Sequence, residues 1–230
     1  MRAVGISMFA LATVATEGTA FAQSATPDAV AAVEQTHRDA IETRRLLADS
    51  VLVAGLVSVA GGAALIVPEA HDQAFRYAGV NTAIFGAVNT VVGLLALHGI
   101  KAEERSWESD EASAARRTPE GLARARVHAA LDERRESVGH AINLGLNCAY
   151  LGVAGTAVLA SQLGVDHPNR WLASGVAVGF QALFLVGIDY IGLTRSQAYH
   201  RSYVLGLEPS VAIVPTAAGT ETRLGISGRF

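Results

Sequence analysis

The chain has 230 residues, of which half are apolar and only 17% are charged. Its mean hydropathy of +0.31 is unlike that of an ordinary soluble domain. The net charge of −3 argues against a nucleic-acid-binding protein, which needs a basic face. The single cysteine, Cys148, excludes an intrachain disulfide and a cysteine-rich metal site. With 23 glycines and few aromatic residues, the composition favours closely packed helices in a lipid bilayer.

Residues 1–22 are predicted to be a signal peptide. A basic residue at position 2 precedes an apolar run, and Ala20 and Ala22 are the small residues that a signal peptidase reads. Cleavage would follow Ala22. An uncleaved anchor is the alternative, but Glu17 interrupts the segment too early for a membrane span of about 20 residues. Export of this kind points to a bacterial cell envelope.

Four stretches are long enough and uncharged enough to cross a bilayer as helices. They cover roughly 50–67, 77–100, 139–163 and 171–193, and Asp189 is the single charge inside them. Their apolar runs are continuous and not alternating, so they are not strands of a barrel. Short loops join the first to the second and the third to the fourth. The predicted fold class is an all-α membrane protein with four transmembrane helices arranged as two hairpins.

The two halves of the chain resemble each other in the order of their features. Thr26-Pro27-Asp28 and Thr118-Pro119-Glu120 each predict a helix start, with Thr as the N-cap and Pro in the first turn. In both halves a His, an Arg-Arg pair and a hairpin follow in that order. We therefore expect two duplicated units, repeat 1 over 26–105 and repeat 2 over 118–204, each an amphipathic helix that leads into a hairpin. Chance recurrence is the alternative.

The domain organisation follows from these segments. A membrane domain is expected over 23–204, with a charged connector over 101–138 between its hairpins. The tail over 205–230 is predicted to form a short β-hairpin. Its terminal Phe230 also resembles the end of an outer-membrane barrel strand, but the chain offers no other strands to close a barrel.

Two topology signals disagree about the orientation in the membrane. Most basic residues share one side with the N-terminal helix, the connector and the tail, and only Arg76 and Arg170 lie in the loops of the other side. The positive-inside rule would place the basic side in the cytoplasm. A cleaved signal peptide would place it outside. We prefer an inner-membrane protein with its N-terminus outside, because the signal peptide acts first during insertion.

Glycines recur at intervals of seven residues in the predicted spans. This spacing removes side chains along one seam and lets helix backbones approach closely. Plain packing within a four-helix bundle is the simpler interpretation, and a helix dimer interface is the alternative. The candidate packing residues are Gly55, Gly62, Gly79, Gly86, Gly93, Gly145, Gly152, Gly175 and Gly179.

Several polar residues lie in or at the ends of the spans. They are Asn89, His98, His140, Asn143, Asn147, Gln181 and Asp189. Hydrogen bonds between helices are the ordinary role of such residues, and a solute path or a proton relay around Asp189 is the alternative. The sequence has no metal-ligand spacing and no nucleophile, phosphate-loop or dinucleotide motif. We therefore expect no cofactor, no metal and no enzymatic activity.

The segments Phe85-Gly86-Ala87-Val88-Asn89 and Gly179-Phe180-Gln181-Ala182-Leu183-Phe184-Leu185-Val186-Gly187-Ile188-Asp189 carry a resemblance. They resemble motifs of an uncharacterised family of bacterial four-span membrane proteins, over roughly residues 40–200. The resemblance implies a helical membrane domain and no known activity.

The favoured function from the sequence is a structural or partner-binding component of the membrane. Its partners would be the lipid bilayer and another membrane protein or a second copy of the chain, associated through the glycine seams, and not a nucleic acid. A small transporter or channel subunit is the alternative, with the polar residues of the spans as its lining.

Overall fold

The computed structural model describes residues 25–67, 73–205, 207–216 and 219–228, and it describes side chains only as far as Leu205. The predicted signal peptide lies outside the described residues. Within them the chain forms five helices, α1 (Pro27–Ile66), α2 (Gln73–Trp107), α3 (Asp110–Arg116), α4 (Pro119–Gln162) and α5 (Pro168–Val204). In this part of the chain four helices, α1, α2, α4 and α5, are long and apolar enough to cross a membrane, as predicted.

Both predicted helix starts are confirmed. The side chain of Thr26 accepts a hydrogen bond from the backbone N–H of Ala29, and that of Thr118 accepts one from Gly121. Each bond satisfies an N–H group that the first turn of a helix leaves free. From these caps, α1 and α4 run without a break from a charged segment into an apolar span.

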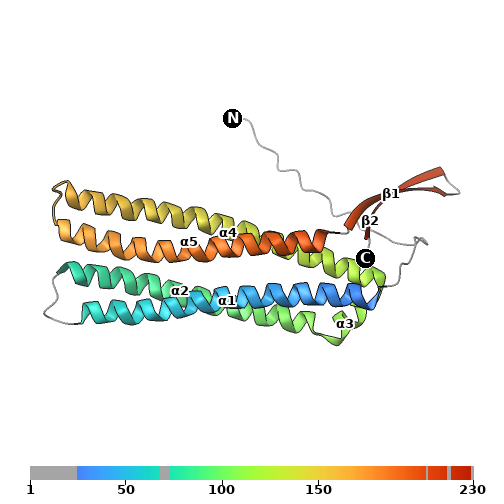
Figure 1. The fold of residues 1–230 in the computed structure, drawn as a ribbon, viewed down its shortest axis with the longest axis horizontal. Coiled ribbons are helices and arrows are strands. Elements are labelled where there is room, and N and C mark those ends of the chain that lie inside the picture. Colours follow the sequence, from blue (N-terminus) through green and yellow to red (C-terminus); the bar gives the residue numbers. More distant parts are fainter. Residues whose placement is uncertain (1–24, 68–72, 206, 217–218, 229–230) are drawn as a thin grey trace.

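The four long helices form two antiparallel pairs, shown in Figure 1. Helix α1 packs along α2, and α4 packs along α5, while α5 makes most of the contacts between the pairs. Buried positions recur every seven residues, for example at Ile41, Ala48, Gly55 and Gly62 of α1. A seven-residue repeat is typical of helices that coil around each other with a left-handed twist.

The protein interior is concentrated at the charged end of the helices. There Val33, Leu122 and Tyr203 belong to one buried cluster contributed by α1, α4 and α5. In the apolar windows of the four long helices, only 11–22% of the residues are buried inside the protein. Large apolar side chains that face outward would be costly in water, so these helices fit a lipid environment.

The C-terminal segment contains a pair of antiparallel strands, β1 (Leu207–Thr216) and β2 (Gly219–Gly228). Leu207 pairs with Gly228 at one end of this ladder, and Thr216 pairs with Gly219 at the other. In Figure 1 they lie at the same end of the molecule as α3.

Candidate functional site

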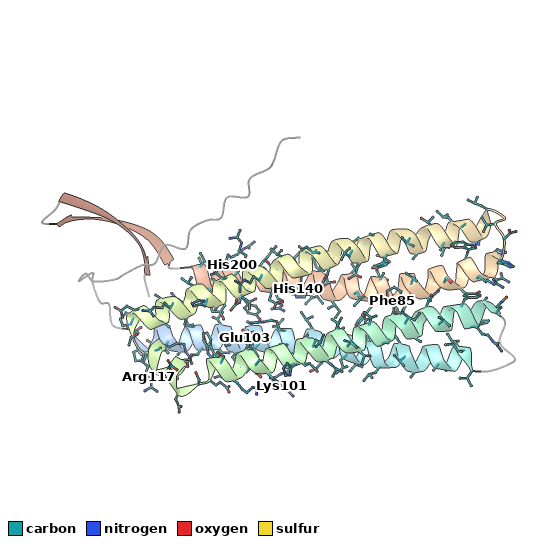
Figure 2. All side chains as sticks on the ribbon, turned by 180° about the vertical axis from the view of Figure 1, so that it is seen from behind. Phe85, Lys101, Glu103, Arg117, His140 and His200 are labelled. Atoms are coloured by element: carbon teal, nitrogen blue, oxygen red, sulfur yellow. The ribbon has the colours of Figure 1, made fainter. Side chains whose placement is uncertain are left out.

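A cavity of about 610 Å³ lies between the two helix pairs and is lined by all four long helices. It begins near Arg44 and Glu103 at the charged end and reaches Phe85 and Tyr150 within the spans. Figure 2 shows Glu103, His140 and Phe85 one after another along the length of the molecule. The cavity therefore extends from the charged end into the apolar part of the helices.

A cluster of three polar side chains joins α4 to α5 beside this cavity. The Asp189 carboxylate accepts a hydrogen bond of 2.8 Å from Asn147 Nδ2, and its other oxygen lies 3.0 Å from His140 Nδ1. His140 and Asn147 are seven residues apart, so both face α5. Asp189 is only 6% exposed. Both oxygens of this buried carboxylate thus have a partner, as burial in an apolar medium requires.

Gly192 provides the space for the His140 ring. A Cβ atom at position 192 would overlap three atoms of the imidazole. The sequence analysis did not identify this glycine, because it does not follow the seven-residue glycine pattern. Its place one helical turn after Asp189 is the signal that could have identified it.

Two aromatic rings mark the inner end of the cavity. Phe85 of α2 and Tyr150 of α4 meet edge to face, with their centroids 5.8 Å apart. One helical turn further along α4, Val153 and Ala154 line a second cavity of about 410 Å³, which extends to Trp171 near the loop end. The aromatic pair thus lies between two cavities that extend toward opposite ends of the spans.

The other predicted polar residues divide into two groups. Asn89 and Asn143 line the larger cavity together with the Asp189 cluster. His98 is exposed and does not line the cavity, so this candidate is not part of the polar group around Asp189. It lies outside the seven-residue stripe of α2 that faces the neighbouring helix. Gln181 is buried, and neither of its amide atoms has a hydrogen-bond partner among the described residues.

Five of the predicted packing glycines lie against one another between α1 and α2. A Cβ atom on Gly62 would lie 2.6 Å from the Gly79 carbonyl oxygen, and one on Gly86 would lie 2.7 Å from that of Gly55. A Cβ atom on Gly93 would lie 2.8 Å from the backbone nitrogen of Leu52. These distances are far shorter than ordinary van der Waals contacts, so only glycine fits at these places.

The packing glycines of the second pair behave differently. A Cβ atom on Gly175 would lie 2.8 Å from the Ala154 carbonyl oxygen, and one on Gly179 would lie 3.3 Å from the Ala154 side chain. Nothing lies within 4 Å of a Cβ atom built on Gly145 or Gly152. Our expectation that these last two pack inside the bundle is therefore wrong, because the inner stripe of α4 passes through Asn147 and Ala154 instead.

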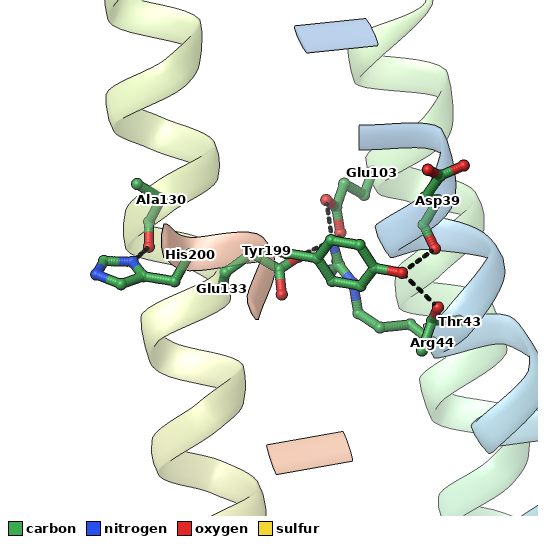
Figure 3. A network of polar contacts seen from close by, with 8 residues as sticks. All are labelled: Asp39, Thr43, Arg44, Glu103, Ala130, Glu133, Tyr199 and His200. Atoms are coloured by element: carbon green, nitrogen blue, oxygen red, sulfur yellow. Dashed lines mark hydrogen bonds and ion pairs between the residues drawn. The ribbon is translucent and has the colours of Figure 1, made fainter. Parts of the chain in front are cut away.

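An ion-pair network connects three helices at the mouth of the cavity (Figure 3). The Arg44 guanidinium of α1 donates two hydrogen bonds to Glu103 of α2, at 2.7 and 2.9 Å. It donates a third, at 3.1 Å, to Glu133 of α4. Nearby, the Tyr199 hydroxyl of α5 lies 2.8 Å from Thr43 Oγ1. The charged ends of the two helix pairs are thereby held together.

Glu133 is the most deeply buried acid of this network. It is 1% exposed, and its Oε2 has no hydrogen-bond partner among the described residues. Burial raises the pKa of Glu133 to about 7, although the Arg44 guanidinium acts in the opposite direction. The Arg44 guanidinium makes two hydrogen bonds to Glu103 and only one to Glu133. Its positive charge therefore offsets the burial of Glu133 only in part. As a result, burial favours the protonated form of Glu133.

The lining of the larger cavity is acidic. Among its charged side chains are three carboxylates, Glu103, Glu136 and Asp189, and one guanidinium, that of Arg44. Because Arg44 is already paired with Glu103, Glu136 and Asp189 dominate the field inside. Among the described residues, no three His, Cys, Asp or Glu side chains come together in a way that could hold a metal ion.

In comparisons with known proteins, no family model, no curated protein and no solved structure matches this chain.

Proposed function

We propose that the chain is a small transporter or channel subunit of a membrane, and that the larger cavity is the half of its solute path that opens at the charged end of the helices. The observation that carries the proposal is Asp189, a carboxylate buried in the apolar part of the helices and placed on the wall of a cavity of about 610 Å³. That volume lies within the range of ordinary ligand sites.

A carboxylate is an expensive way to join two helices in lipid. Its transfer from water costs several kcal/mol, and its hydrogen bonds return only about 0.5–2 kcal/mol each. An apolar pair would hold α4 to α5 at lower cost. A role in binding a solute or a proton explains why an ionisable group stands at this place, and the cavities on both sides of the Phe85–Tyr150 pair support a path interrupted by a narrow constriction.

The test is permeability of liposomes that contain the purified full chain. Proton flux would be measured with an internal pH-sensitive dye, and swelling would be followed in glycerol, urea, alanine and choline. We expect permeation of at least one of these above empty liposomes, and its loss in Asp189→Asn, whose side chain keeps the shape of the carboxylate. Asp49→Asn, which changes an exposed carboxylate outside the cavity lining, is the matched control.

Two results would overturn the proposal. One is an absence of flux for every solute when the protein is correctly folded. The other is a loss of folding or assembly in Asp189→Asn while the flux per folded protein stays unchanged, because Asp189 would then serve pairing alone.

A structural or partner-binding role is the second candidate, and one observation favours it. Gly145 and Gly152 face away from the protein, with nothing within 4 Å of a built Cβ atom, so this side of α4 is open to close approach by another helix. Replacing both with Leu should dissociate a homo-oligomer in cross-linking experiments if α4 forms its interface. Unchanged cross-linking would remove this candidate.

We also propose that the two hairpins arose by duplication. Both begin with a Thr cap followed by Pro, and the close contact of Gly62 with Gly79 recurs as that of Ala154 with Gly175. The contacts fall at matching places along the two antiparallel pairs. An internal comparison of homologous chains that failed to align 26–105 with 118–204 would contradict the duplication.

For the orientation, we propose a bacterial inner-membrane protein whose N-terminus lies outside after removal of a signal peptide. The support is the sequence of the first 22 residues. In a Cys148→Ala background, Ala114→Cys near α3 and Asp166→Cys in the loop before α5 are both exposed sites. A membrane-impermeant thiol reagent applied to intact cells should label the first and not the second. Labelling of the second alone would reverse the orientation.

A further inference from the structure

The larger cavity has the chemistry of a site for one particular class of solute. We infer that it binds a monovalent organic cation of low polarity, such as a substituted amine or a quaternary ammonium or phosphonium ion, with Asp189 as the counter-charge. The inference rests on the proposed function, since it names the solute class of the same path.

The charge of the lining gives the sign of the ligand. Glu136 and Asp189 line the cavity, and neither forms an ion pair with Lys or Arg among the described residues. The one guanidinium in the lining, Arg44, is held by Glu103 and Glu133. An anion would be repelled from this space, whereas a cation would be attracted from the charged end inward.

Asp189 fixes the charge at one. Its oxygens receive hydrogen bonds from an amide and an imidazole, which are neutral donors when the His140 ring carries a single proton. An ionised carboxylate beside a neutral imidazole presents one unit of negative charge within a span, where lipid offers no screening. A ligand with one positive charge cancels it, and a divalent ion would leave an excess charge in the same surroundings.

The remaining lining indicates that the cation is organic. The polar cluster shares the wall with aliphatic side chains, among them Val88, Val92, Leu146, Leu185 and Ile188. Aliphatic walls cannot replace the water shell of a small inorganic cation, but they pack well against alkyl or aryl groups.

The aromatic pair at the inner end supports the same class. The rings of Phe85 and Tyr150 both line the cavity, and aromatic faces attract cations. A cation that lay between this pair and Asp189 would have an aromatic ring on one side and a carboxylate on the other.

The experiment measures equilibrium binding to the full chain in lipid nanodiscs. The probe is radiolabelled tetraphenylphosphonium, and tetraphenylborate, which has nearly the same shape and the opposite charge, is the matched control. Binding to empty nanodiscs is subtracted from both. We expect saturable binding of the cation and none of the anion.

Variants locate the binding within the cavity. Asp189→Asn should weaken phosphonium binding by about tenfold or more, and Phe85→Leu by a few-fold, as loss of a charge and of a cation–π contact predict. Phosphonium binding should be unchanged in Asp49→Asn and Phe184→Leu, because neither residue lines the cavity. Gly99 does line it, and a Cβ atom there meets nothing within 4 Å, so Gly99→Leu should fill the space and reduce binding with every polar group intact.

The outcomes separate this inference from the proposed function. Equal binding of both ions, or phosphonium binding that survives in both Asp189→Asn and Gly99→Leu, overturns the cation site. If liposomes show Asp189-dependent flux of protons or neutral solutes and phosphonium does not bind, the transporter proposal stands and the solute class is wrong. If phosphonium binds at the cavity and no solute crosses the membrane, the site stands and transport is wrong.

Discussion

In the first helix pair, α1 and α2 approach each other through glycine, whereas in the second pair α4 and α5 meet through polar side chains. The contacts of Gly62 with Gly79 and of Ala154 with Gly175 are at matching places in the two pairs. Further toward the charged end, the first pair has Gly93 against Leu52, and the second has His140 against Asp189.

The difference shows what each pair contributes. Backbones that come as close as those of α1 and α2 leave no room for a side chain, so this pair is a rigid wall without ionisable groups along its seam in the spans. The seam of α4 and α5 instead holds a buried carboxylate with its two polar partners and borders the cavity. The same architecture thus supplies a scaffold in one half and a candidate site in the other.

Placing a side chain in the glycine seam between α1 and α2 should have the largest effect on stability. Gly62→Ala forces a Cβ atom against the backbones of Gly79 and Ala83, so the helices must separate, and we expect a loss of about 2–3 kcal/mol in the free energy of unfolding. Gly61→Ala, one residue earlier, meets nothing within 4 Å and should be neutral or stabilising by up to about 1 kcal/mol. Unfolding in mixed micelles measures both. Equal effects of the two variants would contradict the close approach.

The polar seam should tolerate the reciprocal change better. Asn147→Gly leaves Asp189 with His140 as its one remaining partner, and we expect a loss of about 1–2 kcal/mol. The fold should be retained, since glycine at this place restores the pattern of the first pair. If Asn147→Gly proves more damaging than Gly62→Ala in the same unfolding assay, the polar seam is the more important support and our ranking of the two halves is reversed.

Displacing the imidazole should cost less. Gly192→Ala brings a methyl group into the space of the His140 ring, so the ring must move away from Asp189, and we expect a loss of about 1 kcal/mol. Diethyl pyrocarbonate should modify His140 faster in this variant. Gly187→Ala, where nothing lies within 4 Å, should leave the reaction rate as it is in the natural chain. A rate that is the same in all three proteins would place the ring elsewhere.

The smallest change is the pH dependence of the natural chain's stability, because two buried groups with opposing effects lie at the charged end where the pairs meet. Burial raises the pKa of Glu133 from 4.5 to about 7, so its contribution to stability is complete below pH 4.5 and is lost as pH rises through 7. Burial, helped by the charges of Arg44 and Arg116, lowers the pKa of His37 to about 4, so its contribution is present above pH 6.5 and is lost as pH falls through 4.

Single variants should reveal the two opposing slopes. The stability of Glu133→Gln should rise between pH 4 and 6.5, and that of His37→Gln should fall between pH 4.5 and 7, each by at most about 1.4 kcal/mol per pH unit. The natural chain should vary less over the same window. Urea unfolding of the three proteins at several pH values measures these slopes, and slopes of equal sign in the two variants would refute the assignment.

Much of the architecture could be predicted from local patterns. The apolar runs predicted four long helices, and the Thr-Pro caps placed the starts of α1 and α4 at the correct residues. These features depend on neighbours in the sequence, since a cap bond closes over three residues and a span is a matter of continuous composition. Part of the cluster of His140, Asn147 and Asp189 was also predictable from the sequence, because His140 and Asn147 lie one heptad apart on the same helix.

Other features required knowledge of which helix faces which. The spacing of Gly145 and Gly152 is the same as that of Gly55 and Gly62. Yet Gly55 and Gly62 contact the neighbouring helix, whereas Gly145 and Gly152 contact no other helix among the described residues. Periodicity identifies a stripe on a helix and leaves open whether the stripe faces a neighbour or lipid. The same reasoning applies to His98, which is exposed because it lies outside the buried stripe of α2.

The sequence by itself determined the number of spans, the helix starts and the presence of one carboxylate within the apolar segments. Tertiary structure alone decided which glycines touch, that Gly192 makes room for an imidazole, and that the ring pair of Phe85 and Tyr150 separates two cavities. The physical reason is the range of the interactions. Hydrogen bonds within a helix and transfer into lipid act on adjacent residues, whereas packing between helices joins residues that the sequence sets far apart.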